Sequence, residues 1–147
     1  MNWTSQIEAA HARIAPYIRE TPVLAGAYLD LPMPVWLKLE HLQHTGSFKA
    51  RGAFNTLLSG DVPAAGLVAA SGGNHGAAVA FAAQKLGYSA HIFVPELAGS
   101  SKINLIKATG ATLSVVPGAY ADAMQAALAY EATTGAMQIH AYDELPT

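Results

Sequence analysis

The sequence predicts an α/β fold with a parallel sheet, and three of its features point to this class. From residue 66 onward, short apolar runs alternate with longer segments that have helical spacing. The apolar runs show little alternation between apolar and polar side chains, as expected of strands buried on both faces of a sheet. Glycines stand where the predicted helices stop, at Gly87, Gly110 and Gly135. Strands that alternate with helices in this way form βαβ units, whose crossovers are right-handed.

The N-terminal segment is built differently. Ser5 and Glu8 form a capping-box pattern ahead of a predicted helix that ends at Pro16. Residues 21–34 contain several prolines and predict irregular or edge structure. Residues 35–40 alternate apolar and polar side chains, which predicts a short strand.

The rest of the chain predicts about four parallel strands with helices between them. The predicted strands are residues 66–70, 89–95, 111–117 and 136–141. The predicted helices are residues 74–87, 101–110 and 119–135. We expect two units, an N-terminal segment of a larger domain at 1–60 and a small α/β domain at 61–147, with a hinge within 59–66.

The composition is unusually poor in charge. Hydrophobic residues make up 52% of the 147 residues and charged residues 12%, whereas about 25% charged is typical of a soluble domain. We therefore expect either that the chain forms a homo-oligomer, a dimer or a tetramer, or that further polypeptide covers part of its surface.

Charge and cysteine content exclude several classes of function. The net charge of −2, with scattered Lys and Arg, gives no electrostatic basis for binding nucleic acid. The absence of cysteine excludes disulfides, thiolate zinc sites and cysteine nucleophiles. No signal peptide and no apolar run long enough to span a membrane is recognisable, so we expect a cytoplasmic protein without a membrane partner.

The stretch GSFKARGA, residues 46–53, places Lys49 in the first turn of a predicted helix. The positive end of a helix dipole disfavours an ammonium group there by roughly 0.3–1 kcal/mol. Phe48 beside it and Arg51 two residues on add to this penalty. A solvated surface position is the simpler interpretation of a single lysine, whereas a neutral, partly desolvated amine is what covalent bonding to a carbonyl carbon requires.

The stretch SGGNHG, residues 71–76, lies between a predicted strand and a predicted helix. Gly72 and Gly73 allow the backbone to approach a bound group closely, and a helix that begins near Asn74 offers unpaired N–H donors. This arrangement is typical of phosphate or carboxylate binding, although an ordinary βα turn also uses glycine and an Asn cap. The stretch matches neither the dinucleotide-binding pattern nor the Walker pattern.

The spacing of the histidines gives no indication of a metal site. His41 and His44 form the only close pair in the sequence, and neither an HExxH motif nor a carboxylate cluster accompanies them. His91 and His140 fall in predicted strands, where we expect them to be structural.

Together these stretches resemble a known family. KLEHLQHTGSFKARGA, residues 38–53, resembles the lysine motif of fold-type II pyridoxal-phosphate enzymes, most closely the group of serine/threonine dehydratases and serine racemases. SGGNHG resembles the asparagine loop of that family, and residues 12–23 and 93–111 follow the same pattern, so the resemblance covers nearly the whole chain. It implies a fold like that of the tryptophan synthase β subunit, pyridoxal 5'-phosphate as cofactor and a small amino acid as substrate.

The resemblance also implies roles for single residues. Lys49 resembles the lysine that bonds to the cofactor aldehyde and takes the proton from the substrate Cα. Phe48 resembles the residue that packs near the cofactor ring, and Asn74 resembles the asparagine that hydrogen-bonds the ring's 3′-oxygen. The stretch formed by Ser71, Gly72, Gly73, Asn74 and His75 resembles the family's loop that closes on the substrate carboxylate. In the family, the positions of Lys49 and Asn74 lie on opposite sides of a closing cleft.

Two departures from the family pattern bear on function. Racemases of this group carry a second serine where this chain has Gly72, which has no proton to give, so elimination is favoured over racemisation. Residues 77–147 contain nothing that resembles the family's glycine-rich phosphate cradle. The resemblance therefore implies the N-terminal portion of a longer enzyme.

The activity implied is that of an ammonia-lyase, which converts L-threonine or L-serine to a 2-oxo acid and ammonia. Other fold-type II enzymes, such as a serine racemase or a threonine synthase, stay open as alternatives. So does a non-catalytic α/β fragment, because the chain is rich in apolar residues and lacks the cradle.

Overall fold

The computed structural model describes residues 2–26 and 32–141. The α-helices are α1 (Trp3–Ile14), α2 (Lys49–Ser59), α3 (Asn74–Leu86), α4 (Ser100–Ala108) and α5 (Tyr120–Thr134). The strands are β1 (Val23–Ala25), β2 (Trp36–Lys38), β3 (Leu67–Ala70), β4 (Ala90–Pro95), β5 (Thr112–Val116) and β6 (Met137–Gln138). Short 3-10 helices are η1 (Ala15–Tyr17), η3 (Glu40–Leu42) and η4 (His44–Gly46).

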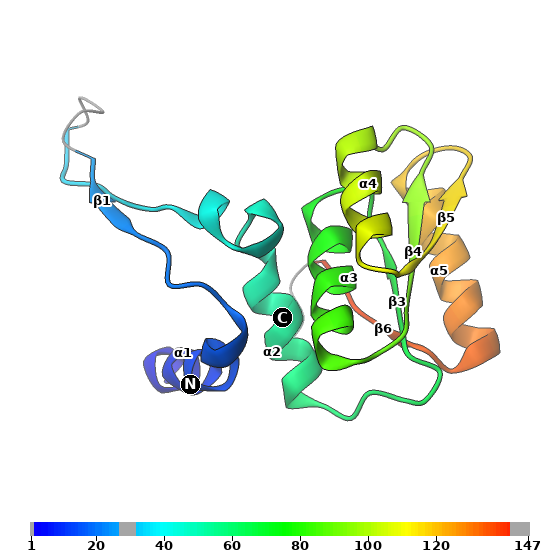
Figure 1. Ribbon diagram of the computed structural model, residues 1–147, viewed down its shortest axis with the longest axis horizontal. Helices are drawn as coiled ribbons and strands as arrows, with labels where there is room; N and C mark the ends of the chain where they lie inside the picture. The colour runs from blue at the N-terminus through cyan, green and yellow to red at the C-terminus, as the bar shows by residue number, and fades with distance from the viewer. Residues whose placement is uncertain (1, 27–31, 142–147) are drawn as a thin grey trace.

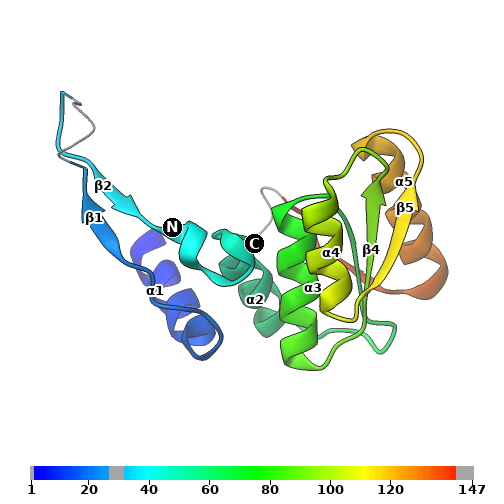
Figure 2. The same ribbon diagram turned by 45° about the horizontal axis from the view of Figure 1, so that its top comes forward.

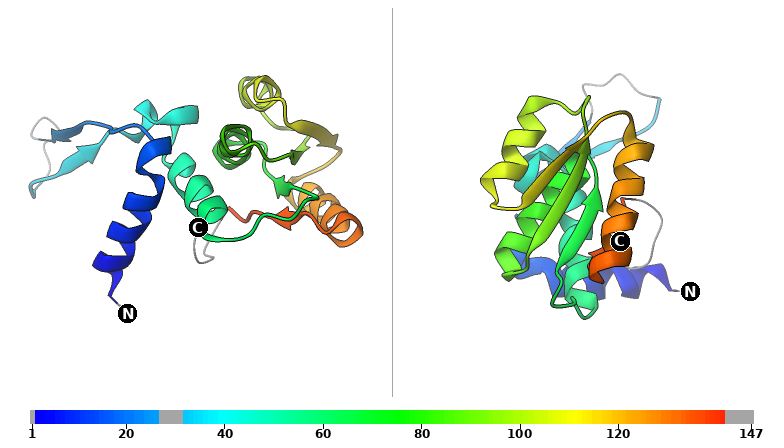
Figure 3. Two further views of the ribbon diagram at one scale, coloured as in Figure 1. Left: turned by 60° about the horizontal axis from the view of Figure 1, so that its bottom comes forward. Right: turned by 90° about the vertical axis from the view of Figure 1, so that its right-hand side faces the viewer.

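The main sheet has the strand order β5-β4-β3-β6, and all its pairings are parallel. Helices α3 and α4 cover one face of it and α5 covers the other (Figures 1 and 3). This follows from the right-handed crossover rule, because the chain steps outward from β3 to β5 and then returns past β3 to β6. The predicted α/β class with a parallel sheet is therefore confirmed. The reversal of direction lies between β3 and β6, which makes this the topological switch point of the sheet.

Helix α3 is buried on nearly all sides because its side chains are small. Its core positions are Ala77, Ala78, Val79, Ala80, Ala82 and Ala83. Alanine allows close approach both to the sheet and to α2, whose Ala53, Phe54 and Leu57 join the same core cluster. This alanine-rich helix therefore packs on the sheet with one side and on α2 with the other. The predicted boundary near residue 60 stays a prediction.

The N-terminal segment extends away from the α/β unit. Strands β1 and β2 pair antiparallel, with Val23 opposite Lys38, and form a ribbon that projects outward (Figures 1 and 2). The strand predicted at 35–40 is present but shorter, at Trp36–Lys38. Large apolar side chains stay exposed here, namely Trp3, Ile7, Val23, Leu24, Met33, Trp36, Leu42 and Phe48.

Several boundaries differ from the sequence-based expectation. The first helix begins at Trp3 with Asn2 as its N-cap, because the Asn2 side chain accepts the backbone N–H of Ser5; the predicted Ser5–Glu8 capping box is wrong. The strand predicted at 136–141 is assigned only at Met137–Gln138, although the Ile139 N–H still donates to the Val68 carbonyl at 2.9 Å. The glycine exits are confirmed, since Gly87, Gly110 and Gly135 have φ of +77°, +80° and +73°.

Across the described residues, every helix is too short or too polar to cross a lipid bilayer.

Candidate active site

Two of the predicted site residues, Lys49 and His75, bond to the same segment at the switch point of the sheet. The loop 71–74 leaves the carboxyl end of β3, and residues 139–141 leave the carboxyl end of its neighbour β6. The Nζ of Lys49, the first residue of α2, donates a hydrogen bond to the carbonyl of Ala141. The ring of His75, in the first turn of α3, bonds to the carbonyl of Ile139 at 2.8 Å. Open α/β sheets bind their ligands at such switch points, outside the carboxyl ends of the strands.

Lys49 lies at the start of α2, as predicted, and is partly buried. Helix α2 has no side-chain cap, so its first-turn N–H groups and Lys49 share the positive end of the helix. The Ala141 carbonyl offsets this by accepting a hydrogen bond from the lysine. The amine also lies 5.4 Å from the centre of the Phe48 ring, and that ring is 59% exposed. The amine therefore lies beside an aromatic side chain that is exposed to solvent.

Arg51 does not add an uncompensated positive charge beside Lys49, contrary to the expectation from spacing. Its Nε and Nη2 donate to the two carboxylate oxygens of Glu40 at 2.9 and 2.8 Å. Thr21 donates to the same carboxylate at 2.6 Å. Hydrogen bonding by Arg51 lowers the pKa of Glu40 despite its burial, and Glu40 in turn raises the pKa of Arg51. This ion pair connects α2 to η3, in the part of the N-terminal segment that precedes α2.

The loop that follows β3 is tightly packed. The N–H of Ser71 donates to the Phe93 carbonyl at 2.9 Å, and the Ser71 hydroxyl accepts the N–H of Gly73 at 3.2 Å. A Cβ on Gly76 would lie 2.5 Å from the Ser71 carbonyl oxygen, so only glycine fits there without a shift. A Cβ on Gly72 would lie 2.4 Å from the Cβ of Ala98. The glycine at 72 therefore also lets the β4–α4 loop lie close to this one.

Helix α3 begins at Asn74 and has Gly73 as its N-cap, so no side chain caps it. The backbone N–H groups of its first turn are the donors that an anion at this end would use. Asn74 is exposed, and a Cβ on Gly73 would meet nothing within 4 Å. Space and donors are thus present on the outer side of the loop, as the anion-binding hypothesis requires.

His75 is directed into the protein. Only 6% of it is exposed, and burial lowers the pKa of its ring, an effect that the Ile139 hydrogen bond partly opposes. The positive charge of Lys49 lowers the pKa of His75 further, because the two side chains lie near each other. Contact of the His75 ring with substrate stays a prediction, and its side chain is engaged by Ile139.

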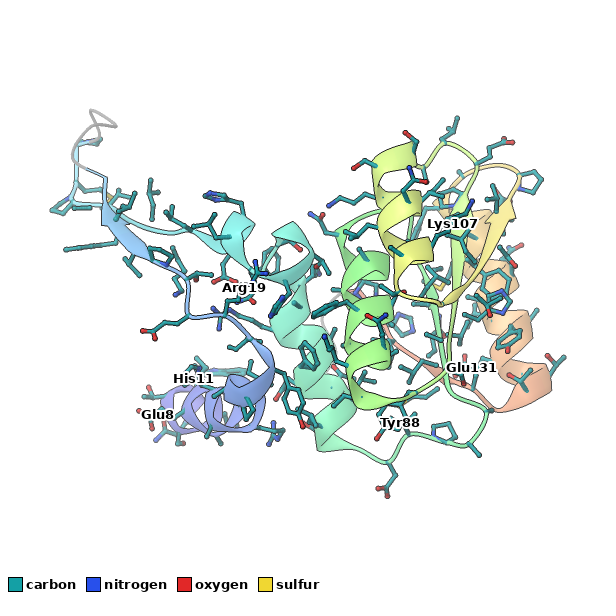
Figure 4. The ribbon with its side chains drawn as sticks, in the orientation of Figure 1. Glu8, His11, Arg19, Tyr88, Lys107 and Glu131 are labelled. Atoms are coloured by element: carbon teal, nitrogen blue, oxygen red, sulfur yellow. The ribbon has the colours of Figure 1, made fainter. Side chains whose placement is uncertain are left out.

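Gln43 is a structural residue that the sequence did not single out. It is 2% exposed, accepts the N–H of Arg19 at 2.9 Å and donates to the Arg19 carbonyl at 2.8 Å. Figure 4 shows Arg19 close to η3 and η4, and its guanidinium also donates to the Leu42 carbonyl at 3.2 Å. The sequence feature that could have indicated this role is that Gln43 is a polar residue inside the lysine motif. Residues 139–141 offered none, because no motif marks them.

The remaining histidines make contacts within the fold. Among residues 2–26 and 32–141, no group of three His, Asp or Glu side chains could hold a metal ion. His91 stacks on Phe93 with ring centres 4.3 Å apart and bonds to the Ser114 hydroxyl at 2.8 Å, which confirms a structural role. His44 stacks on Phe81 at 4.8 Å.

Known proteins resemble this chain in sequence and in structure. The catabolic L-threonine dehydratase TdcB of Staphylococcus aureus (strain N315) is 46% identical over 71% of this chain. A threonine deaminase from T.th. is 40% identical over 96% of the chain with a TM-score of 0.84. Maize serine racemase is 35% identical over 95% of the chain with a TM-score of 0.87.

The match covers only part of these proteins. The chain spans 32% of the dehydratase, 46% of the deaminase and 44% of the racemase. The family described as "Pyridoxal-phosphate dependent enzyme" matches residues 14–147. Because that match extends over most of the chain and its structural relatives share the same architecture, the chain belongs to the family of pyridoxal-phosphate-dependent enzymes of fold type II.

Proposed function

We propose that this chain supplies the lysine and the carboxylate-binding loop of a pyridoxal-phosphate-dependent dehydratase that acts on L-threonine or L-serine. The observation that carries the proposal is the meeting of Lys49 and the loop 71–75 at the switch point, through residues 139–141. The similarity to threonine dehydratase and threonine deaminase supports a hydroxy amino acid as substrate.

The residues present fit the aldehyde and the ring of such a cofactor. Lys49 offers a partly buried amine for its aldehyde, and the exposed Phe48 ring lies beside that amine. When bound, the cofactor supplies the aldehyde that links to the amines of the lysine and the substrate, and a ring that takes up electrons from the substrate Cα. Asn74, exposed at the start of α3, would donate to an oxygen on that ring.

The chain's own groups divide the remaining work. The backbone N–H groups of the loop and the Ser71 hydroxyl would hold the substrate carboxylate and so orient its Cα–H bond. The Nζ of Lys49 would take the Cα proton and pass a proton on as the β-hydroxyl leaves as water. Hydrolysis of the product returns that water and releases ammonia and a 2-oxo acid, so the reaction needs no oxidant.

A racemase is the second candidate, because maize serine racemase has the same architecture over 95% of this chain. Racemisation needs a proton donor on the opposite face of the Cα, and Gly72 has no side chain to provide one. A serine at this position would bring its Cβ to 2.4 Å from the Ala98 Cβ, so the β4–α4 loop would have to shift. Both observations favour elimination.

The proposal is tested by titrating the purified 147-residue chain with pyridoxal phosphate. We expect saturable growth of a near-visible absorption band, and borohydride should then fix the cofactor on Lys49, as peptide mass spectrometry would show. Lys49→Ala should abolish the band, whereas Lys85→Ala, at the far end of α3, should leave it unchanged. A native chain without specific label on Lys49 would instead support a non-catalytic fragment.

Substrate class is tested on the loaded chain by following 2-oxo acid from L-threonine and L-serine, and D-serine from L-serine. Production of 2-oxo acid without D-serine is the result expected of a dehydratase. Homo-oligomerisation of the whole enzyme and its cytoplasmic location stay predictions.

A further inference from the structure

Two backbone carbonyls on one short segment hold both key side chains of the site. The Ile139 carbonyl is bonded to the His75 ring at 2.8 Å, and the Ala141 carbonyl accepts the hydrogen bond from Lys49. Both residues are buried, with exposed fractions of 2% and 8%. Ile139 and Ala141 are two residues apart, so one short segment serves both partners.

The segment has few other attachments to the sheet. Strand β6 is assigned over Met137–Gln138 only, and beyond it the Ile139 N–H donates to the Val68 carbonyl at 2.9 Å. The His75 bond therefore adds a second hydrogen bond to the backbone of Ile139, two residues before Ala141. In the absence of that bond, Ile139 would keep its N–H bond to Val68 and its place in the core, but its carbonyl, two residues before Ala141, would lose its partner on α3.

The chemistry of the contact defines the state of the ring. A carbonyl oxygen only accepts, so the ring nitrogen that faces Ile139 must carry a proton, and the ring is an Nε2–H donor. Burial disfavours protonation of the second nitrogen, as the lowered pKa of His75 indicates. A neutral donor buried against a carbonyl is suited to holding backbone in place.

We propose that the His75 side chain is a positioning residue for Lys49, acting through residues 139–141. It fixes the segment whose Ala141 carbonyl orients the lysine amine at the edge of the sheet. The inference rests on the proposed function of Lys49 as the amine that bonds to the cofactor. It assigns the His75 ring a task inside the protein and leaves substrate binding to the backbone N–H groups of the loop.

Two substitutions separate the donor from the bulk of the ring. His75→Gln keeps an N–H donor that reaches a nearby carbonyl, and His75→Leu keeps apolar volume without a donor. The readout is the rate at which formaldehyde and cyanoborohydride methylate Lys49 in the purified chain, followed by peptide mass spectrometry. Lys107, exposed on α4 away from the site, is the internal reference (Figure 4).

We expect His75→Leu to raise the Lys49 rate relative to Lys107 by roughly 2- to 10-fold, the range that the net strength of one hydrogen bond allows. His75→Gln should stay close to the native rate. An unchanged Lys49 rate in a folded His75→Leu chain would overturn the inference, as would equal changes in both variants.

A second measurement needs no substitution and so covers the case in which His75→Leu fails to fold. Nitrogen-15 NMR of the native chain should show His75 as the neutral ring protonated on Nε2. A ring protonated on Nδ1 alone would overturn the inference. Because methylation uses no pyridoxal phosphate, a rate change in His75→Leu supports positioning even if the cofactor titration fails. Conversely, cofactor trapping on Lys49 with unchanged methylation rates would support the function and refute the positioning role.

Discussion

The α/β unit and the N-terminal segment bury their apolar side chains to very different degrees. In β3 and β4 most apolar side chains are buried, and α3 lies between the sheet and α2. In the N-terminal segment, Trp3, Met33 and Trp36 are 58%, 67% and 70% exposed. A groove of about 540 Å³ also lies open between α1 and α2, lined mostly by apolar surface. The strands β3 and β4 and helix α3 are thus well buried, whereas α1 and the β1–β2 ribbon leave large apolar side chains exposed.

The difference shows what holds each region. Burial of apolar surface stabilises the α/β unit, whereas the residues before α2 join it through Ile14, the stacked Tyr17–Phe54 pair and polar bonds. The Glu40–Arg51 ion pair and the Arg13–Asn55 hydrogen bond reach α2, whereas the Thr21–Glu40 bond and the two bonds of Gln43 to the Arg19 backbone hold the segment itself together. The relatives are longer than this chain. The expectation that further polypeptide covers the exposed N-terminal side chains stays a prediction.

The largest effect should come from truncating the same residue type in the two regions. Leu67 in β3 is 1% exposed and Leu24 in β1 is 44% exposed. Leu67→Ala should lower the free energy of unfolding by about 2–5 kcal/mol because it leaves a cavity, and Leu24→Ala should lower it by less than about 1 kcal/mol. Denaturant unfolding of the purified chain measures both values. Similar losses for the two variants would show that the ribbon is buried in solution.

A smaller effect is expected within the loop of the site. Gly76→Ala should gain about 1 kcal/mol in helix propensity. The Cβ would however lie 2.5 Å from the Ser71 carbonyl, and such overpacking costs about 1–3 kcal/mol, so we expect net destabilisation. Gly60→Ala is the control, because nothing lies within 4 Å of its Cβ and its backbone is extended, and it should change stability by less than about 0.5 kcal/mol. Thermal unfolding compares the two. A stabilised Gly76→Ala chain would mean that the loop shifts at little cost in free energy to accommodate the Cβ.

The smallest effect should come from the polar bonds. Glu40→Gln removes the charge that Arg51 and Thr21 bond, and should cost about 1 kcal/mol because the pair is only partly buried. Hydrogen exchange of the β1 and β2 amides is the sensitive measurement, since the segment opens locally. Glu8→Gln, on the exposed surface of α1, is the control (Figure 4).

The same carboxylate predicts a pH dependence. The folded-state pKa of Glu40 lies below its ordinary value of 4.5, chiefly because Arg51 hydrogen-bonds it. Its contribution is therefore present above pH 4.5 and is lost as the pH falls through the lowered pKa. Protection of the β1 and β2 amides should decrease over this acidic range in the native chain and be flat in Glu40→Gln. Equal acid sensitivity of both chains would contradict the role of the pair.

Much of the site could be predicted because its markers are local. The position of Lys49 at a helix start and the glycine loop ahead of α3 follow from spacing and residue type. The pairing of Arg51 with Glu40 could not, since a cation two residues from Lys49 gives no sign of a partner eleven residues away. The N-cap was misplaced because Asn2 and Ser5 both suit that position, and in the structure the Asn2 side chain accepts the Ser5 N–H.

The sequence by itself determined which segments become helix or strand, where glycines end the helices and which residues carry the family motifs. These properties are local, since they depend on side-chain period and backbone preference within one segment. The tertiary structure decided the strand order, and with it the neighbourhood of β3 and β6 that brings Ile139 and Ala141 to His75 and Lys49. That order depends on which buried faces pack against each other across long stretches of chain, and no single segment encodes it.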